Sequence, residues 1–132
     1  MIPSLVGTWR LVRAEAWDGD GRPLPPPYGG AQAMGHLVFT ASGRMMAVLC
    51  DGRPALPAGV VREYNSYCGN YTFDGTRLST TVDAAATGIP VGSVQVRAVS
   101  MEGDLLVLRP PPRRDGNGTV QRMLVWERLP IP

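Results

Sequence analysis

Turn signals recur along the chain at near-regular intervals. Gly follows Asp, Asn, Glu or Ser at 18–19, 20–21, 42–43, 51–52, 74–75, 102–103, 115–116 and 117–118. Such pairs tolerate the positive φ that tight hairpins demand. The intervening segments are rich in Val, Leu, Thr and aromatic residues and predict strands near 6–17, 34–40, 44–50, 69–74, 77–83, 92–102, 104–109 and 120–129. Short strands joined by turns indicate an all-β meander, either a sandwich or a barrel.

Side-chain alternation assigns the two faces of several predicted strands. On the first strand, Trp9, Leu11 and Arg13 are expected to share a face. On the second, Leu37 and Phe39 are expected to share one. The 132 residues correspond to one domain, which we take to span residues 1–132.

Three segments depart from the strand pattern. From Ala58 to Cys68, apolar residues are spaced as on one face of a helix, which predicts a short helix before the fourth strand. The Pro-rich stretch Pro23–Gly30 cannot be a central strand and predicts an ordered or extended loop. The stretch Pro110–Gly118 predicts a second loop.

The residue census excludes several kinds of chemistry. All 13 basic residues are arginine, so Schiff-base catalysis and a lysine-based phosphate loop are excluded. The single histidine cannot build a His-rich metal site, and the scattered arginines form no basic stripe for nucleic acid. Cys50 and Cys68 form no CxxC motif. No secretory signal or membrane-spanning run is visible, so we expect a cytoplasmic protein with reduced thiols.

Several sequence blocks, in order along nearly the whole chain, carry a family resemblance. The first is Leu5–Val12, with a Gly-x-Trp at the start of the first strand, and the later blocks are Gly35–Ala47, Tyr67–Tyr71, Gln95–Arg97 and Leu124–Arg128. Together they resemble the bacterial and fungal lipocalin-like domain family. The resemblance implies a small antiparallel calycin-type β-barrel of eight to ten strands with one short helix. It also implies that Trp9 plugs one end and that Arg128 or Arg122 stacks on it.

Arg97 is the first candidate for a functional side chain. It alternates with Gln95 on a strand whose other face carries Val96, so both polar side chains are expected to point into the barrel. A guanidinium placed there must be paired or bind an anion. The two alternatives are a structural ion pair, with Glu127 as the candidate partner, and a ligand contact.

The remaining candidates each have a structural alternative. His36 is the default general base, although it could equally be a solvent-facing strand residue. Tyr64, Tyr67 and Tyr71 would line or cover the barrel mouth, or simply pack there. Met46, together with Met45 and Met101, would fill cavity walls or the core, and Phe39 completes the candidate ligand contacts.

Three functions are compatible with these residues. The first is binding of a small hydrophobic or amphipathic molecule inside the barrel. The second is a cofactor-independent cyclase or isomerase that shapes a biosynthetic intermediate. The third is an interaction module with a filled core. No metal or cofactor and no nucleic-acid partner is expected, and a homo-oligomer stays open as an alternative to a monomer.

Overall fold

Antiparallel strands and one short 3₁₀ segment make up the protein, which is described here by a computed structural model of residues 4–86, 88–116 and 118–131. The strands in that part of the chain are β1 (Gly7–Asp18), β2 (Ala33–Phe39), β3 (Arg44–Asp51), β4 (Tyr64–Phe73), β5 (Arg77–Ala85), β6 (Val94–Glu102), β7 (Leu105–Arg109), β8 (Arg113–Asp115) and β9 (Gly118–Arg128). The 3₁₀ segment, η1, spans Pro27–Gln32.

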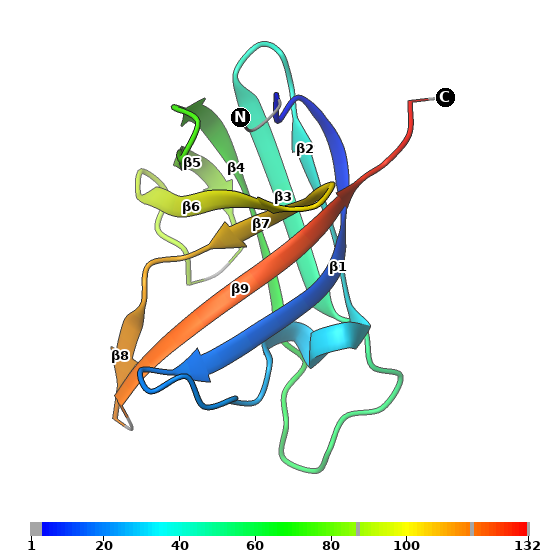
Figure 1. Ribbon diagram of the computed structural model, residues 1–132, viewed down its shortest axis with the longest axis vertical. Coiled ribbons are helices and arrows are strands. Elements are labelled where there is room, and N and C mark those ends of the chain that lie inside the picture. Colours follow the sequence, from blue (N-terminus) through cyan, green and yellow to red (C-terminus); the bar gives the residue numbers. More distant parts are fainter. Residues whose placement is uncertain (1–3, 87, 117, 132) are drawn as a thin grey trace.

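The sheet closes into a barrel. Sequential neighbours pair from β1 through β7, β7 then pairs with β9, and β9 pairs back onto β1. The short β8 adds to the free end of β9 outside the closed ring (Figure 1). Closure removes the exposed strand edges that an open sheet would present. The predicted lipocalin-like barrel is therefore confirmed, and the sandwich is ruled out.

The core lies inside this ring. Leu37 and Phe39 on β2 are buried, while His36, which precedes Leu37, is exposed. The same period of two buries Leu78 and Val82 on β5. Inward and outward side chains alternate because successive residues of a strand point to opposite faces. The predicted face of β2 is confirmed.

A β-bulge changes the face of the second half of β1. The register against β9 shifts between Leu11 and Arg13, so Val12 is the extra residue. Beyond it Ala14 is buried, whereas Arg13 points outward and forms ion pairs with Glu15 and Glu102. The expectation that Arg13 shares a face with Trp9 and Leu11 is wrong for this reason.

The predicted helix at Ala58–Cys68 is also wrong. Residues 58–63 belong to the loop between β3 and β4, and β4 begins at Tyr64. The one helical segment of the described residues lies elsewhere: η1 begins inside the predicted loop Pro23–Gly30. In the second predicted loop, residues 113–115 form β8. Asn117, also in that predicted loop, lies outside the described residues.

Trp9 seals one end of the barrel. The indole is 1% exposed, and its Nε1 donates to the carbonyl oxygen of Leu5 at 3.0 Å. Arg128 stacks on the ring, with its guanidinium carbon 4.2 Å from the ring centroid. Arg128 also donates to the carbonyl oxygens of Ser4 and Val6, at 2.6 Å each. The stacking that the resemblance implied is thus made by Arg128.

Position 7, beside this stack, has no room for a side chain. Gly7 has φ +135°, and a Cβ at this position would lie 2.8 Å from Nη1 of Arg128. Glycine therefore lets the Arg128 guanidinium reach both the indole and the backbone of the N-terminal segment. The start of β1 and the end of β9 lie at this end, while η1 and the loop between β3 and β4 lie at the other end (Figure 1).

Candidate functional site

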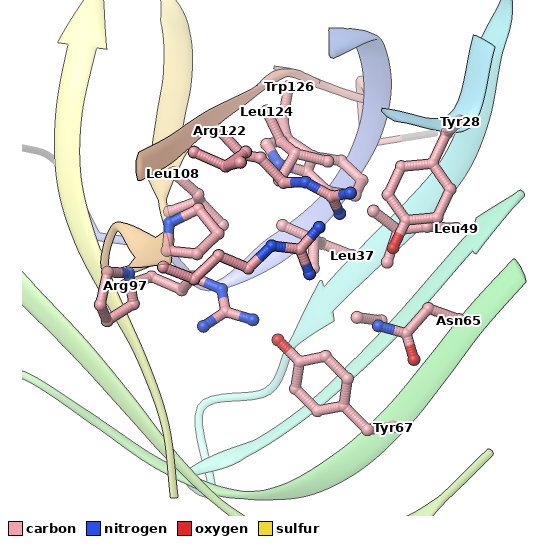
Figure 2. Close-up of a pocket in the computed structure, with 15 residues that line it drawn as sticks. Tyr28, Leu37, Leu49, Asn65, Tyr67, Arg97, Leu108, Arg122, Leu124 and Trp126 are labelled. Carbon is pink, nitrogen blue, oxygen red and sulfur yellow. The ribbon is translucent and has the colours of Figure 1, made fainter. Parts of the chain in front are cut away.

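A cavity of about 180 Å³ lies inside the barrel toward the end that carries η1 (Figure 2). A cavity of about 150 Å³ already holds a benzene molecule, so this space suits a one- or two-ring molecule or part of a longer one. The lining residues are Tyr28, Leu37, Ala47, Leu49, Asn65, Tyr67, Arg97, Leu108, Pro110, Pro111, Arg113, Val120, Arg122, Leu124 and Trp126.

The floor of the cavity is apolar and its mouth is polar. Leu37, Ala47 and Trp126 are fully buried side chains from β2, β3 and β9. Pro111 and Arg113, after β7, are exposed and so lie where the cavity meets solvent. An amphipathic molecule would gain about 25 cal/mol for each Å² of apolar surface it buried against the floor.

Tyr67 and Tyr28 bring phenol groups to the cavity. Burial raises the pKa of Tyr67, although the nearby guanidinium of Arg97 acts to lower it. Burial also raises the pKa of Tyr28, and the negative charge of Glu63 adds to that effect. Both phenols therefore stay neutral near pH 7 and keep a hydrogen to donate.

The backbone of Tyr28 is held in an uncommon conformation. Its φ of 56° lies in the left-handed region, which non-glycine residues rarely adopt. Its N–H donates to Oε1 of Glu63 at 2.9 Å, so a carboxylate from the β3–β4 loop fixes the conformation. Such outliers occur where the surrounding structure positions a side chain for use. Here the side chain positioned is a phenol of the cavity wall.

Arg97 reaches the cavity from β6. Its guanidinium donates to the carbonyl oxygen of Val96 at 2.8 Å and to Oε1 of Gln95 at 3.1 Å. It has no ion pair with any carboxylate of the described residues. The proposed partner Glu127 lies on the outer face of β9 and pairs with Arg10 instead. The structural ion pair expected between Arg97 and Glu127 is therefore absent.

Arg122 and Trp126 contribute donors from β9. Nη1 of Arg122 lies 3.3 Å from Oε2 of Glu63, but its Nε is buried with no hydrogen-bond partner among the described residues. The indole Nε1 of Trp126 is buried and equally without a partner there. Buried donors are nearly always satisfied in folded proteins, and each one left alone costs about 1–3 kcal/mol. Two such donors therefore belong to side chains that line one cavity.

The cavity is rich in hydrogen-bond donors and positive charge. Arg97, Arg113 and Arg122 line it, and no Asp or Glu is among the described lining residues. Figure 2 shows the Tyr67 hydroxyl directed toward the guanidinium groups, and Tyr28 and Asn65 on the facing wall. In the described part of the chain, no cluster of His, Cys, Asp and Glu could hold a metal ion. The arrangement is suited to holding an acceptor-rich molecule.

Three candidates predicted from the sequence lie on the outer face of the barrel. Tyr64 and Met46 are 57% and 54% exposed, on the outward faces of β4 and β3. His36 is exposed on the outward face of β2. None of these three side chains lines the cavity.

The other candidates point inward, and two of them, Arg97 and Tyr67, line the cavity. Gln95 does not line it but accepts a hydrogen bond from Arg97. Phe39 and Tyr71 form an edge-to-face pair in the core, with ring centroids 5.1 Å apart, and the Tyr71 hydroxyl donates to the carbonyl oxygen of Thr40. Met45 is also a core residue.

Sequence reasoning missed most of the polar wall. Arg122 was considered only as a stacking partner for Trp9, yet it shares the inward face of β9 with Leu124 and Trp126. The period of two along that strand could have indicated this position. Tyr28 and Arg113 carry no such signal, because the irregular 3₁₀ segment η1 and the three-residue strand β8 bring them to the cavity.

A closed β-barrel with an internal cavity defines a class of protein that binds ligands inside the barrel. A family model for the lipocalin-like domain matches residues 6–129. The chain therefore belongs to the lipocalin-like domain family. No curated protein matched the sequence. Among the described residues, the helical part is too short and too polar to cross a bilayer.

Proposed function

We propose that the protein binds a small amphipathic molecule inside the barrel. The observation that carries the proposal is the cavity itself, which combines an apolar floor with the indole N–H of Trp126, a donor without a partner among the described residues. An interaction module with a filled core would not leave this space or this donor. The cavity therefore supports a binding function over that alternative.

The binding test uses an apolar probe that fits the space. We expect 2-methylnaphthalene to bind the native protein at one saturable site, because the probe would bury its surface on the floor. Ala47→Leu adds bulk to the cavity wall and should weaken binding at least tenfold. Val48→Leu is the matched control, since Val48 is the next residue on β3 and is 46% exposed.

Two results would contradict the proposal. The first is the absence of saturable binding to the native protein in a fluorescence titration. The second is equal binding by Ala47→Leu and the native protein, which would place the probe on the outer surface. Urea unfolding of both variants checks that each one folds.

A cofactor-independent isomerase or cyclase is the second candidate. The observation that favours it is the pair of neutral phenols, Tyr28 and Tyr67, on one cavity wall. A neutral phenol can donate a proton to a bound substrate while the cavity fixes the substrate's shape. Turnover of a bound polyunsaturated or epoxide-bearing acid by the native protein, lost in Tyr67→Phe, would favour catalysis. Binding without turnover would favour the first candidate.

A further inference from the structure

The donors of the cavity wall are more numerous than its acceptors. The guanidinium of Arg97 donates to Gln95 and to the backbone of its own strand, and the Tyr67 hydroxyl lies beside it. Among the described residues, Arg122 keeps a buried Nε without a partner, and Trp126 keeps a buried Nε1 without one. A carboxylate accepts hydrogen bonds and donates none, so it is the complement of such a wall.

The charges of the wall favour the same kind of group. Arg97 and Arg122 each bring a positively charged guanidinium to the wall. In the described part of the chain, the one carboxylate in contact with them is Glu63, which lies 3.3 Å from Nη1 of Arg122. It divides its two oxygens between that contact and the backbone N–H of Tyr28. The wall therefore keeps excess positive charge at a half-buried position, where a paired anion interacts more strongly than in water.

The geometry points to a ligand whose headgroup is a carboxylate. We propose that the bound molecule places this carboxylate between Arg97 and Arg122 and its apolar body against Leu37, Ala47 and Trp126. This inference rests on the proposed function and adds the chemical class of the ligand. A planar guanidinium pairs with a planar carboxylate through two parallel hydrogen bonds. The cavity of about 180 Å³ leaves room for such a small headgroup beside one or two rings.

The test compares two probes of nearly the same shape. 2-Naphthoate carries a carboxylate, and 2-naphthamide replaces that group with a neutral amide. We expect the native protein to bind 2-naphthoate at least tenfold more tightly, which corresponds to the usual strength of a hydrogen bond to a charged group. Equal affinity for the two probes would overturn the carboxylate inference while leaving the binding function in place.

Variants of the two arginines test whether they cause the preference for 2-naphthoate over 2-naphthamide. Arg97→Met and the double variant Arg122→Met/Glu63→Gln should each bind the two probes almost equally. The double variant avoids leaving the Glu63 carboxylate without its arginine. Arg77→Met is the matched control: it removes one positive charge from the exposed outer side of β5 and should keep the preference for 2-naphthoate. Arg97→Lys should keep part of the preference, because the charge remains but the planar group is lost.

Each remaining outcome has a definite meaning. A preference that survives in both cavity variants would overturn the assignment to Arg97 and Arg122. Loss of the preference for 2-naphthoate in Arg97→Met, with the preference kept in the double variant, would overturn the two-arginine arrangement. If the double variant does not fold in urea-unfolding controls, Arg97→Met decides, since removing Arg97 leaves no carboxylate unpaired among the described residues. Failure of both probes and of 2-methylnaphthalene to bind would instead overturn the binding function itself.

Discussion

At the scale of single residues, Trp9 closes the barrel end opposite the mouth of the cavity. Its indole is fully buried, is stacked by Arg128 and donates to the backbone of the N-terminal segment. The side chain therefore connects the start of β1 to the end of β9, where the ring of strands closes. Trp9 therefore contributes both to the stability of the fold and to the closure of the barrel.

Trp9→Ala should lower the free energy of unfolding by about 3–5 kcal/mol, the usual cost of truncating a buried aromatic side chain. Urea unfolding measures this loss of stability. Trp17→Ala is the control, because Trp17 is only half-buried on the outer face of the barrel and should lose less than half as much. A loss below about 1 kcal/mol for Trp9→Ala would contradict the role of the indole as a plug.

Asp51, at the end of β3, makes a pH-dependent contribution to the stability of the folded protein. Hydrogen bonds from the Arg53 side chain, together with one from its backbone N–H, lower the pKa of Asp51 from 3.8 to about 2. A carboxyl whose pKa is lower in the folded state stabilises that state above its unfolded pKa. This contribution is present near neutral pH and is lost as the pH falls from about 4 toward 2.

Asp51→Asn should therefore be less stable than the native protein at pH 7, with the difference shrinking as the pH falls below 3.8. The measurement is urea unfolding of both proteins across that pH range. Parallel stability curves would show that Asp51 has the same proton affinity in the folded and unfolded states.

Residue-scale prediction from the sequence worked where a strand is regular. Strict alternation on β6 placed Arg97 on the inward face, whereas Tyr67 reaches the cavity from β4 although the sequence predicted a helix there. The same reasoning failed for Arg13, because a single extra residue in β1 exchanges the two faces of everything that follows. Turn-forming residues mark the ends of strands, but nothing in the sequence around Val12 marks this bulge.

At the scale of elements, a second irregularity lies where β4 pairs with β5. The register between β4 and β5 shifts between Cys68 and Gly69. At Gly69 the neighbouring strand comes so close that a Cβ would lie 1.9 Å from the carbonyl oxygen of Thr81. Only glycine fits this approach, so Gly69 fixes the position of the strand that carries Tyr67 and Asn65.

Gly69→Ala should lower the free energy of unfolding by at least about 2 kcal/mol, because backbone atoms must move to relieve the overlap. The control is Gly116→Ala, since a Cβ at Gly116 meets nothing within 4 Å and the change should cost about 0.5 kcal/mol or less. Equal unfolding midpoints for the two variants would show that β5 can shift without cost.

The predicted helix at 58–68 shows why one element could not be assigned from the sequence. Barrel strands of this protein carry apolar residues on the outer face too, as Tyr64 on β4 does. Apolar residues on both faces hide the period of two, and Val60 and Val61 in the preceding loop completed a helix-like spacing. Loop residues that are exposed and apolar carry no local signal that separates them from a helix face.

At the scale of the whole molecule, the barrel is plugged at one end and hollow toward the other. Trp9 and the Phe39–Tyr71 pair fill the first part, and the cavity occupies the second. The fold was predictable from the sequence because strands, turns and family resemblance agree on it. The cavity wall was not, because it is assembled from β4, β6, β9 and two irregular segments that meet only on closure.

A ligand that enters this cavity should stabilise the whole barrel, because it binds the folded state alone. At a free concentration of 2-naphthoate about one hundred times its Kd, the gain is about 2.7 kcal/mol. Thermal unfolding with and without the probe measures the gain as a rise in Tm. Val48→Leu should show the same rise and Ala47→Leu a much smaller one; equal rises would place the stabilising contact outside the cavity.

The unpartnered indole of Trp126 gives the protein a built-in spectroscopic reporter. In a nitrogen–proton correlation spectrum, Trp9, Trp17 and Trp126 each contribute one indole peak, well separated from the backbone amides. The Trp9 proton is already bonded to Leu5, whereas the Trp126 proton has no acceptor among the described residues. A ligand whose apolar body packs against Trp126 should therefore shift the Trp126 peak and leave the Trp9 peak in place. Occupancy can thus be followed in unmodified protein, with a reference signal in the same chain.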